Sequence, residues 1–216
     1  MICRKSDNDS IQKCISSLKK GGIVIIPTDT VYGFSGIVDE IACDEKVDGN
    51  SPLYHTDSII RKIKGREEYK PFIQLISSPQ EIYNYTDDVI PQKLLDYWPG
   101  PLTIIVNRKG QCGNRELVGN RELVGSGLQT LALRCPGDEW LRKVIAGCGA
   151  SIYSTSVNRS GQPVLDSEAE IISEFYEEVD LIVADGDRKS SVPSTIVKVD
   201  KENYTIIRQG AIKLQA

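Results

Sequence analysis

Four cations gather in one short stretch of a chain whose formal net charge is -4. The segment KIKGREEYKP, residues 62–71, carries Lys62, Lys64, Arg66 and Lys70 and ends at a proline. Cations packed this densely repel one another unless water, salt or a bound anion neutralises them. The segment is therefore either a solvated helix end or a cradle for a polyanion, and the rest of the chain has to decide between the two.

Hydroxyl side chains follow the apolar run IVII. The next stretch, PTDTVYG (27–33), places Thr28, Thr30 and Tyr32 where that run ends. Open α/β sheets bind ligands at the carboxyl ends of their strands, so these hydroxyls are candidate ligand contacts. The alternative is a plain turn, in which Thr28 and Asp29 bond to nearby backbone. Spacing alone leaves both interpretations open.

A second polar stretch, STSVNRSG (154–161), poses the same choice. Ser154, Ser156 and Asn158 alternate along it, so an extended backbone would put all three on one face. Such a face either meets solvent or binds a ligand.

Two arginines end further apolar runs, Arg134 after TLAL and Arg208 after YTII. Each alone is more often a surface ion-pairing residue. Together with the hydroxyls and the cations of 62–71, however, they suit a nucleoside triphosphate and a small carboxylate-bearing substrate.

Several other functions lack their sequence signals. There is no G-x-x-x-x-G-K-[ST] phosphate loop. The single histidine, His55, has no nucleophile-elbow serine that it could activate, which argues against a Ser-His-Asp hydrolase. The six cysteines form no C-x-x-C pair and no zinc set, which indicates reduced thiols of a cytoplasmic protein. We expect neither a signal peptide nor a membrane span, because no apolar run is long enough.

The elements that must position these residues read as an α/β pattern in a single domain, 1–216. Apolar periodicity predicts helices at 11–18, about 57–63, 138–145 and 167–175. It predicts strands at 23–26, 71–76, 102–107, 128–134, 151–156, 180–184, 194–199 and 204–208. The last two strands are joined by a short turn, so we expect a twisted, mixed parallel and antiparallel sheet flanked by helices. Surface loops are expected at 39–56 and at 108–127, which repeats GNRELV.

Motifs spread along almost the whole chain resemble the YrdC-like family of threonylcarbamoyl-AMP synthases. In order they are GGIVIIPTDTVYGFSG, IKGREEYKPF, YWPGPLTIIV, TLALRCP, STSVNRSG and PSTIVKV followed by IIRQGAI. They include a K-x-R pair, Lys64 with Arg66, and an S-x-N pair, Ser156 with Asn158. The resemblance implies the YrdC-like fold in its short, single-domain form. It also implies the synthesis of threonylcarbamoyl-AMP and pyrophosphate from L-threonine, bicarbonate and ATP, which supplies a tRNA modification.

The resemblance also implies roles for individual residues. Lys64 and Arg66 would be catalytic, beside the phosphates. The residues expected at the nucleotide are Arg66, Lys70, Thr130, Ser156, Asn158 and Arg208. Those expected at threonine are Thr30, Tyr32, Arg134, Ser154 and Ser194. The family often has asparagine where Lys70 stands, alanine where Val157 stands and a polar residue near Leu75, so contacts there are expected to differ.

Magnesium would accompany ATP, and no protein metal site is expected. The expected partners are the downstream tRNA-threonylcarbamoyl transferase machinery and, through a weak contact, tRNA. Attack by a carbamate oxygen on the α-phosphate needs no enzyme nucleophile, so positioning and charge neutralisation suffice.

Two other functions remain open on these residues. A non-catalytic RNA-binding ribosome or tRNA accessory factor would use the same basic stretch, although such a surface usually exposes aromatic side chains among its cations. A carbamoyl-transferring maturation enzyme sharing the domain would need far more chain and clustered cysteines.

Overall fold

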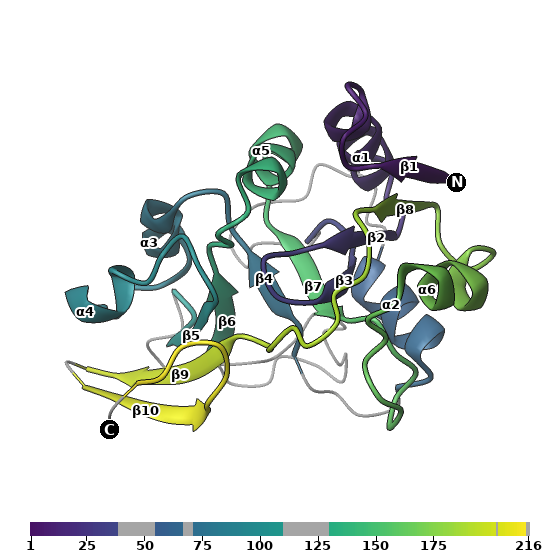
Figure 1. Ribbon diagram of the computed structural model, residues 1–216. Coiled ribbons are helices and arrows are strands. Elements are labelled where there is room, and N and C mark those ends of the chain that lie inside the picture. The colour runs from purple at the N-terminus through teal and green to yellow at the C-terminus, as the bar shows by residue number, and fades with distance from the viewer. Residues whose placement is uncertain (39–54, 67–70, 110–129, 202, 215–216) are drawn as a thin grey trace, which may run out of the picture.

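The molecule is built on one long, twisted sheet with helices against both of its faces (Figure 1). This computed structural model describes residues 1–38, 55–66, 71–109, 130–201 and 203–214. The strands are β1 (Ile2–Arg4), β2 (Val24–Pro27), β3 (Tyr32–Ser35), β4 (Ile73–Leu75), β5 (Leu102–Asn107), β6 (Thr130–Arg134), β7 (Ile152–Ser156), β8 (Leu181–Ala184), β9 (Thr195–Asp200) and β10 (Asn203–Arg208). The helices are α1 (Ser10–Lys19), α2 (Thr56–Lys64), the 3-10 turn η1 (Pro79–Glu81), α3 (Ile82–Tyr85), α4 (Gln92–Leu95), α5 (Glu139–Cys148) and α6 (Glu168–Phe175).

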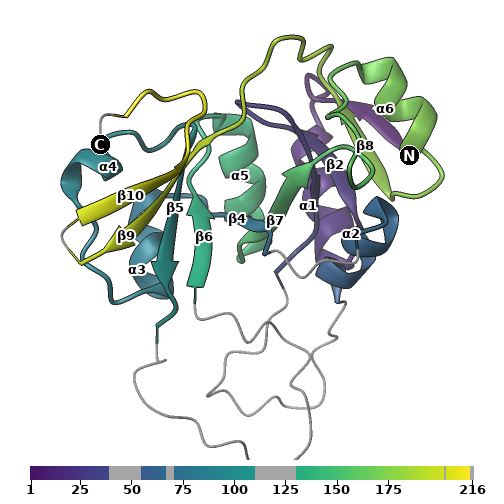
Figure 2. The ribbon, with the colours of Figure 1, turned by 90° about the horizontal axis from the view of Figure 1, so that it is seen from below.

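The sheet is mixed, as the sequence predicts. Its ten strands run in the order β1-β8-β2-β3-β7-β4-β6-β5-β9-β10. The parallel pairs are β1–β8, β2–β8, β4–β6 and β5–β9, and the remaining neighbours are antiparallel, including β9 with β10. Strand β7 joins the two halves, because it pairs with β3 on one side and β4 on the other (Figure 2).

Three apolar clusters hold the helices to the sheet. Ile26 of β2 packs in a cluster with α1 and α5, whereas its neighbour Ile25 packs in a second cluster with α2 and α6. Because successive side chains of a strand point to opposite faces, these two helix pairs cover opposite faces of the sheet. The third cluster packs α3 and α4 against β5, β6 and β9. One face of the β6–β5–β9 half therefore lacks a helix layer among the described residues.

The expected helices and strands are confirmed to within a few residues at each end. Strands β1 and β3 and the short segments η1, α3 and α4 were not predicted. Residues 39–54 and 110–127 of the expected loops lie outside the described residues, and Thr56 belongs to α2 rather than to the loop before it. Among the described helices, none has both the length and the apolar character that crossing a bilayer requires.

Candidate active site

A strip of three hydroxyl and two small or apolar residues lies on the face of the sheet opposite the second and third clusters, beside the first cluster, against which Ile73 packs. Ser154 of β7, Ile73 of β4 and Ala132 of β6 are in register across three strands. Side chains in register share a face, and so do those two residues away, which adds Thr130 and Ser156 to the strip. All five are only half-buried. The intervening leucines of β6 are buried in the third cluster, so the strip is the open side of the strand.

Lys64 approaches one end of this strip from the last turn of α2. Its side chain is buried, and its Nζ donates to the carbonyl oxygens of Ser156 at 2.5 Å and Asn158 at 2.9 Å, and to Asn158 Oδ1 at 2.9 Å. Within the described part of the chain it pairs with no carboxylate. Burial, with a smaller effect of the Arg66 charge, lowers the pKa of Lys64 from 10.5 to about 8.

A small pocket opens beside this lysine, with a volume of about 180 Å³. Its lining consists of Lys64, Arg66, Thr155, Ser156, Asn158, Ser160 and Gly161. The Asn158 amide is held in one orientation, since its Oδ1 accepts from Ser156 Oγ at 2.8 Å while its Nδ2 donates to the Gln162 carbonyl at 2.7 Å. Two cations and several hydroxyl and amide groups around a small cavity are a suitable receptor for phosphate oxygens.

The way helix α2 ends explains why Lys64 and Arg66 lie at the pocket. Gly65 follows the helix with φ 63°, a left-handed conformation that glycine adopts without strain and that ends the helix at Lys64. The helix carboxyl end carries partial negative charge, which favours the basic residues of its last turn. The segment 62–66 is therefore a helix end whose final lysine turns inward toward the pocket, and the polyanion cradle remains a prediction.

A second group of residues surrounds Arg134, the last residue of β6. Its guanidinium is almost fully buried and donates from Nε to the Gly100 carbonyl, from Nη1 to Thr30 Oγ1 at 2.9 Å and from Nη2 to Asp29 Oδ1 at 2.5 Å. Asp29 Oδ2 also accepts from the Gly137 amide. The β2–β3 turn is thereby tied to the end of β6, three strands away in the sheet.

The third group is an extension of the second. Ile104 pairs with Leu133, which places Thr103 beside Arg134. Thr103 Oγ1 and Ser194 Oγ lie 2.8 Å apart, and both residues are buried. Arg208 Nη2 donates to the Ser194 carbonyl at 2.8 Å.

The structure brings most of the predicted site residues into these groups. Lys64, Arg66, Ser156 and Asn158 share the pocket, Thr30 contacts Arg134, Ser194 contacts Arg208, and Thr130 and Ser154 lie on the strip. The position of Ser154 brings its Oγ within 2.8 Å of where a Cβ on Gly33 would lie. Lys70 lies outside the described residues.

Tyr32 is engaged in a different way from the other hydroxyls. It is buried, its hydroxyl donates to the Gly186 carbonyl and accepts from the Asp185 amide, and burial raises its pKa. These contacts tie Tyr32 to the connection between β8 and β9.

Sequence reasoning missed Asp29, Thr103, Ser160 and Gly161 as site residues. All four stand inside the quoted motifs, so motif membership was an available signal for each of them. The contact of Thr103 with Ser194 could not be foreseen, because the two residues are distant in the chain. Among the described residues, no group of three or more His, Cys, Asp or Glu gathers to hold a metal ion.

The sequence and the fold are similar to those of known proteins. A family model named Sua5–YciO–YrdC, with the description "Telomere recombination", matches residues 16–210. A Methanocaldococcus jannaschii protein named putative threonylcarbamoyl-AMP synthase is 32% identical over 94% of this chain and 89% of its own length. A Pyrococcus abyssi threonylcarbamoyl-AMP synthase is 27% identical over 92% of this chain, which spans only 53% of that relative.

A solved structure extends the likeness to three dimensions. The crystal structure of Pyrococcus abyssi Sua5 complexed with L-threonine superposes with a TM-score of 0.74 at 25% sequence identity, over 97% of this chain and 57% of that one. The family model covers more than half of the sequence, and the fold agrees with it. The chain therefore belongs to the Sua5–YciO–YrdC family.

Proposed function

We propose that this chain is an L-threonylcarbamoyladenylate synthase, which converts L-threonine, bicarbonate and ATP to threonylcarbamoyl-AMP and pyrophosphate. The observation that carries the proposal is the buried Lys64 cation, whose hydrogen-bond acceptors among the described residues are all neutral, beside Arg66 at a pocket of about 180 Å³. Relatives that carry the name of this activity match almost the whole chain and support it.

The nucleotide phosphates would bind at the pocket. A cation without a carboxylate partner leaves its charge available to an anion, and charge-assisted hydrogen bonds are about twice as strong as neutral ones. Lys64 and Arg66 would stabilise the negative charge that develops toward pyrophosphate, while Ser156 and Asn158 orient Lys64. Thr130, Arg208 and Lys70 are proposed as further nucleotide contacts.

The chemical step needs positioning rather than a nucleophile from the protein. The threonine amine and bicarbonate give a carbamate with loss of water. A carbamate oxygen then forms a bond to the α-phosphorus as the bond to pyrophosphate breaks. Magnesium would be bound by the triphosphate oxygens, the ligands it prefers, and would neutralise part of their charge.

Threonine would bind around Arg134. The guanidinium offers five donors in a planar fork that matches a carboxylate, and three of them have the partners described above. Thr30, Tyr32, Ser154 and Ser194 are proposed as the remaining contacts. Pyrococcus abyssi Sua5 has been solved in complex with L-threonine, which supports threonine as the substrate class.

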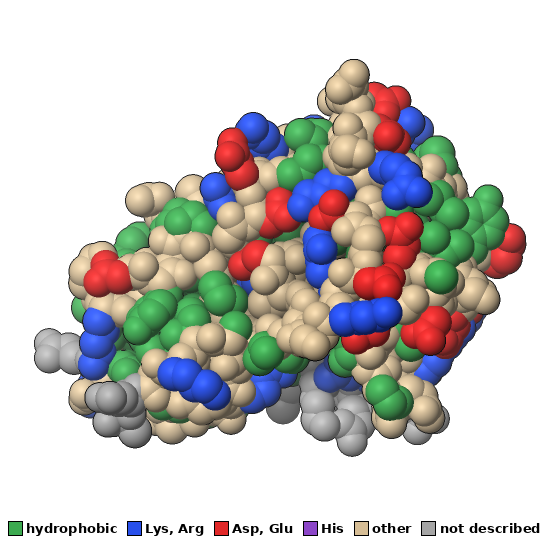
Figure 3. All heavy atoms as spheres, in the orientation of Figure 1, with side chains coloured by type: hydrophobic (Ala, Val, Ile, Leu, Met, Phe, Trp, Pro, Cys, Tyr) green, Lys and Arg blue, Asp and Glu red, His purple; other side chains and the backbone are tan. Residues whose placement is uncertain are grey.

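The product is a mixed anhydride, and we propose that it passes to a tRNA-modifying transferase in the cytoplasm. Direct tRNA contact would be weak. On the face seen in Figure 3, Lys and Arg side chains are interspersed with Asp and Glu, which weakens the attraction of that face for a phosphate backbone.

The test is pyrophosphate release in the presence of ATP, magnesium, bicarbonate and one amino acid at a time. Release should depend on threonine and bicarbonate together. Serine, which lacks the methyl group of threonine, and valine, which has a methyl group in place of the hydroxyl, are the matched controls. Release independent of the amino acid, or no release with confirmed ATP binding, would refute the proposal.

A further inference from the structure

Arg159 lies directly behind the proposed nucleotide pocket. Its neighbours Asn158 and Ser160 both line the pocket, whereas its own guanidinium binds carboxylates of helix α6 and the turn after it. Nε donates to Glu174 Oε1 at 2.9 Å, and Nη1 and Nη2 donate to the two oxygens of Glu178. These hydrogen bonds, the Glu178 bonds first, hold the pKa of Arg159 above its usual range.

The same guanidinium also reaches helix α2. Nη1 donates to the carbonyl oxygen of Ile63, one of the last carbonyls of that helix, which lack partners within the helix. The guanidinium carbon lies 4.5 Å from the centre of the Phe175 ring, a cation–π distance. One side chain therefore joins the 158–161 turn, the end of α2 and α6.

These contacts matter because the pocket has two walls. The end of α2 provides one wall, with Lys64 and Arg66, and the 158–161 turn provides the other. The walls meet through the Lys64 contacts with Asn158 and through the Ser160 amide, which donates to the Lys64 carbonyl at 2.7 Å. The Arg159 bond to Ile63 lies next to this junction in the chain.

We propose that Arg159 is a positioning residue of the nucleotide pocket, which keeps the 158–161 turn against the end of α2 so that Lys64 retains its acceptors. With two carboxylates beside it, its charge is neutralised, so it does not itself bind the ligand. The role in nucleotide binding rests on the proposed function, whereas the role in holding the two walls together does not.

The partial exposure of the Arg159 ion pairs indicates that they act on the local geometry of the pocket rather than on global stability. The side chains of Arg159, Glu174 and Glu178 are 35%, 37% and 40% exposed, so solvent screens their ion pairs. Their loss should leave global stability nearly unchanged. The junction of the two walls, by contrast, should open more often, because local opening depends on local contacts.

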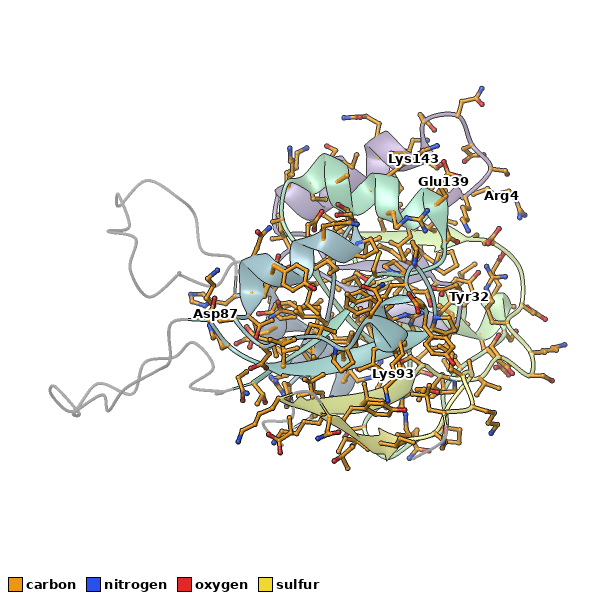
Figure 4. The ribbon with its side chains drawn as sticks, turned by 90° about the vertical axis from the view of Figure 1, so that its left-hand side faces the viewer. Arg4, Tyr32, Asp87, Lys93, Glu139 and Lys143 are labelled. Atoms are coloured by element: carbon orange, nitrogen blue, oxygen red, sulfur yellow. The ribbon has the colours of Figure 1, made fainter. Side chains whose placement is uncertain are left out.

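The test compares Arg159→Met with the wild-type protein. Methionine keeps the apolar contact with Phe175 but removes every donor. Lys143→Met is the matched control, because Lys143 pairs with Glu139 on the outer side of α5 (Figure 4). Hydrogen exchange of the Ser160 amide reports on the junction, and the Tyr153 amide, which donates to Gly36, reports on the neighbouring strand.

We expect amide exchange at Ser160 to be about tenfold faster in Arg159→Met than in wild type, because the net loss of one charge-assisted hydrogen bond changes the opening equilibrium by about that factor. Exchange at Tyr153 should be unchanged. The ATP dissociation constant, measured by calorimetry, should rise by about the same factor while the KM for threonine stays near the wild-type value. Arg159→Lys, which restores the positive charge and its N–H donors at a single point, should recover part of both effects.

Unchanged Ser160 exchange in folded Arg159→Met would overturn the inference. If that variant does not fold, Glu178→Gln replaces it, with a smaller change in the same direction expected and no change again contradicting the inference. A wild-type protein that binds no ATP would refute the proposed function alone, and faster Ser160 exchange in Arg159→Met would still support the positioning role.

Discussion

Lys64 should take up a proton when a nucleoside triphosphate binds. Without ligand its buried ammonium faces neutral acceptors and the Arg66 charge among the described residues, and its pKa is about 8. A phosphate oxygen in the pocket would add a negative charge beside it. An anion close to an ammonium favours the charged form, so binding raises the pKa of Lys64.

The magnitude follows from these charges. Two unit charges about 4 Å apart interact by about 4 kcal/mol at an effective dielectric constant of about 20, which corresponds to about three pKa units. Lys64 would then be fully protonated in the complex at any pH below about 9. From a pKa of about 8 in the free protein, the uptake should be about 0.1 proton at pH 7, about 0.5 at pH 8 and about 0.9 at pH 9.

Calorimetry of ATP binding in two buffers with different ionisation enthalpies measures this uptake. Lys64→Met has a side chain of similar length without a titrating group, so the difference between it and wild type isolates Lys64 from protons exchanged by ATP. Lys143→Met should behave as the wild type does. Equal uptake in wild type and Lys64→Met, or a difference that does not change with pH, would refute this reasoning.

Three further predictions concern stability and substrate binding. The folded pKa of Lys64 lies below its unfolded value of 10.5, so the unfolded chain binds more protons than the folded one between about pH 8 and 10.5. Urea titrations should therefore show the free energy of unfolding of wild type, relative to that of Lys64→Met, rising by about 3 kcal/mol across that window. A constant or falling difference would count against the buried cation. Arg134→Lys replaces a planar fork with a point charge and should raise the KM for threonine about tenfold while the KM for ATP stays constant, so an equal shift in both would show that Arg134 does not act on threonine selectively. Thr195 Oγ1 donates to the Ile212 carbonyl and accepts from the Gly210 and Ile212 amides, so Thr195→Val should lower the free energy of unfolding by about 2 kcal/mol or more in urea, and a smaller loss would mean that water replaces those bonds.

Apolar runs predict the regular strands well, because strands such as β2 and β8 are buried along their whole length. The strand predicted at 102–107 has the same bounds in the structure, with Leu102, Ile104 and Val106 buried in the third cluster. Strand β3 was missed because its residues follow Thr-Asp-Thr and include a glycine, a composition typical of a turn. It forms because β2 offers an antiparallel partner directly before it in the chain.

The contacts within the site were less predictable than its composition. The motifs name the hydroxyls and arginines, but the ion pair of Arg134 with Asp29 joins segments separated by β3, β7 and β4 in the sheet. Only the register and twist of four strand pairs bring them together. Likewise, the basic run at 62–66 is typical of an exposed helix end, and the burial of Lys64 arises because that end packs against the turn after β7.

The position of β8 in the sheet affects how this protein folds during translation. Strand β8 lies between β1 and β2 and is parallel to both, with Ile2 opposite Ile182. Strands β1 and β2 are therefore separated in the sheet by a strand that is translated much later than either. Until residues 181–184 leave the exit tunnel, the nascent β2 keeps an unpaired apolar edge, and such edges invite intermolecular pairing. A chaperone that shields the N-terminal segment during translation should therefore raise the yield of folded protein more than one added after release.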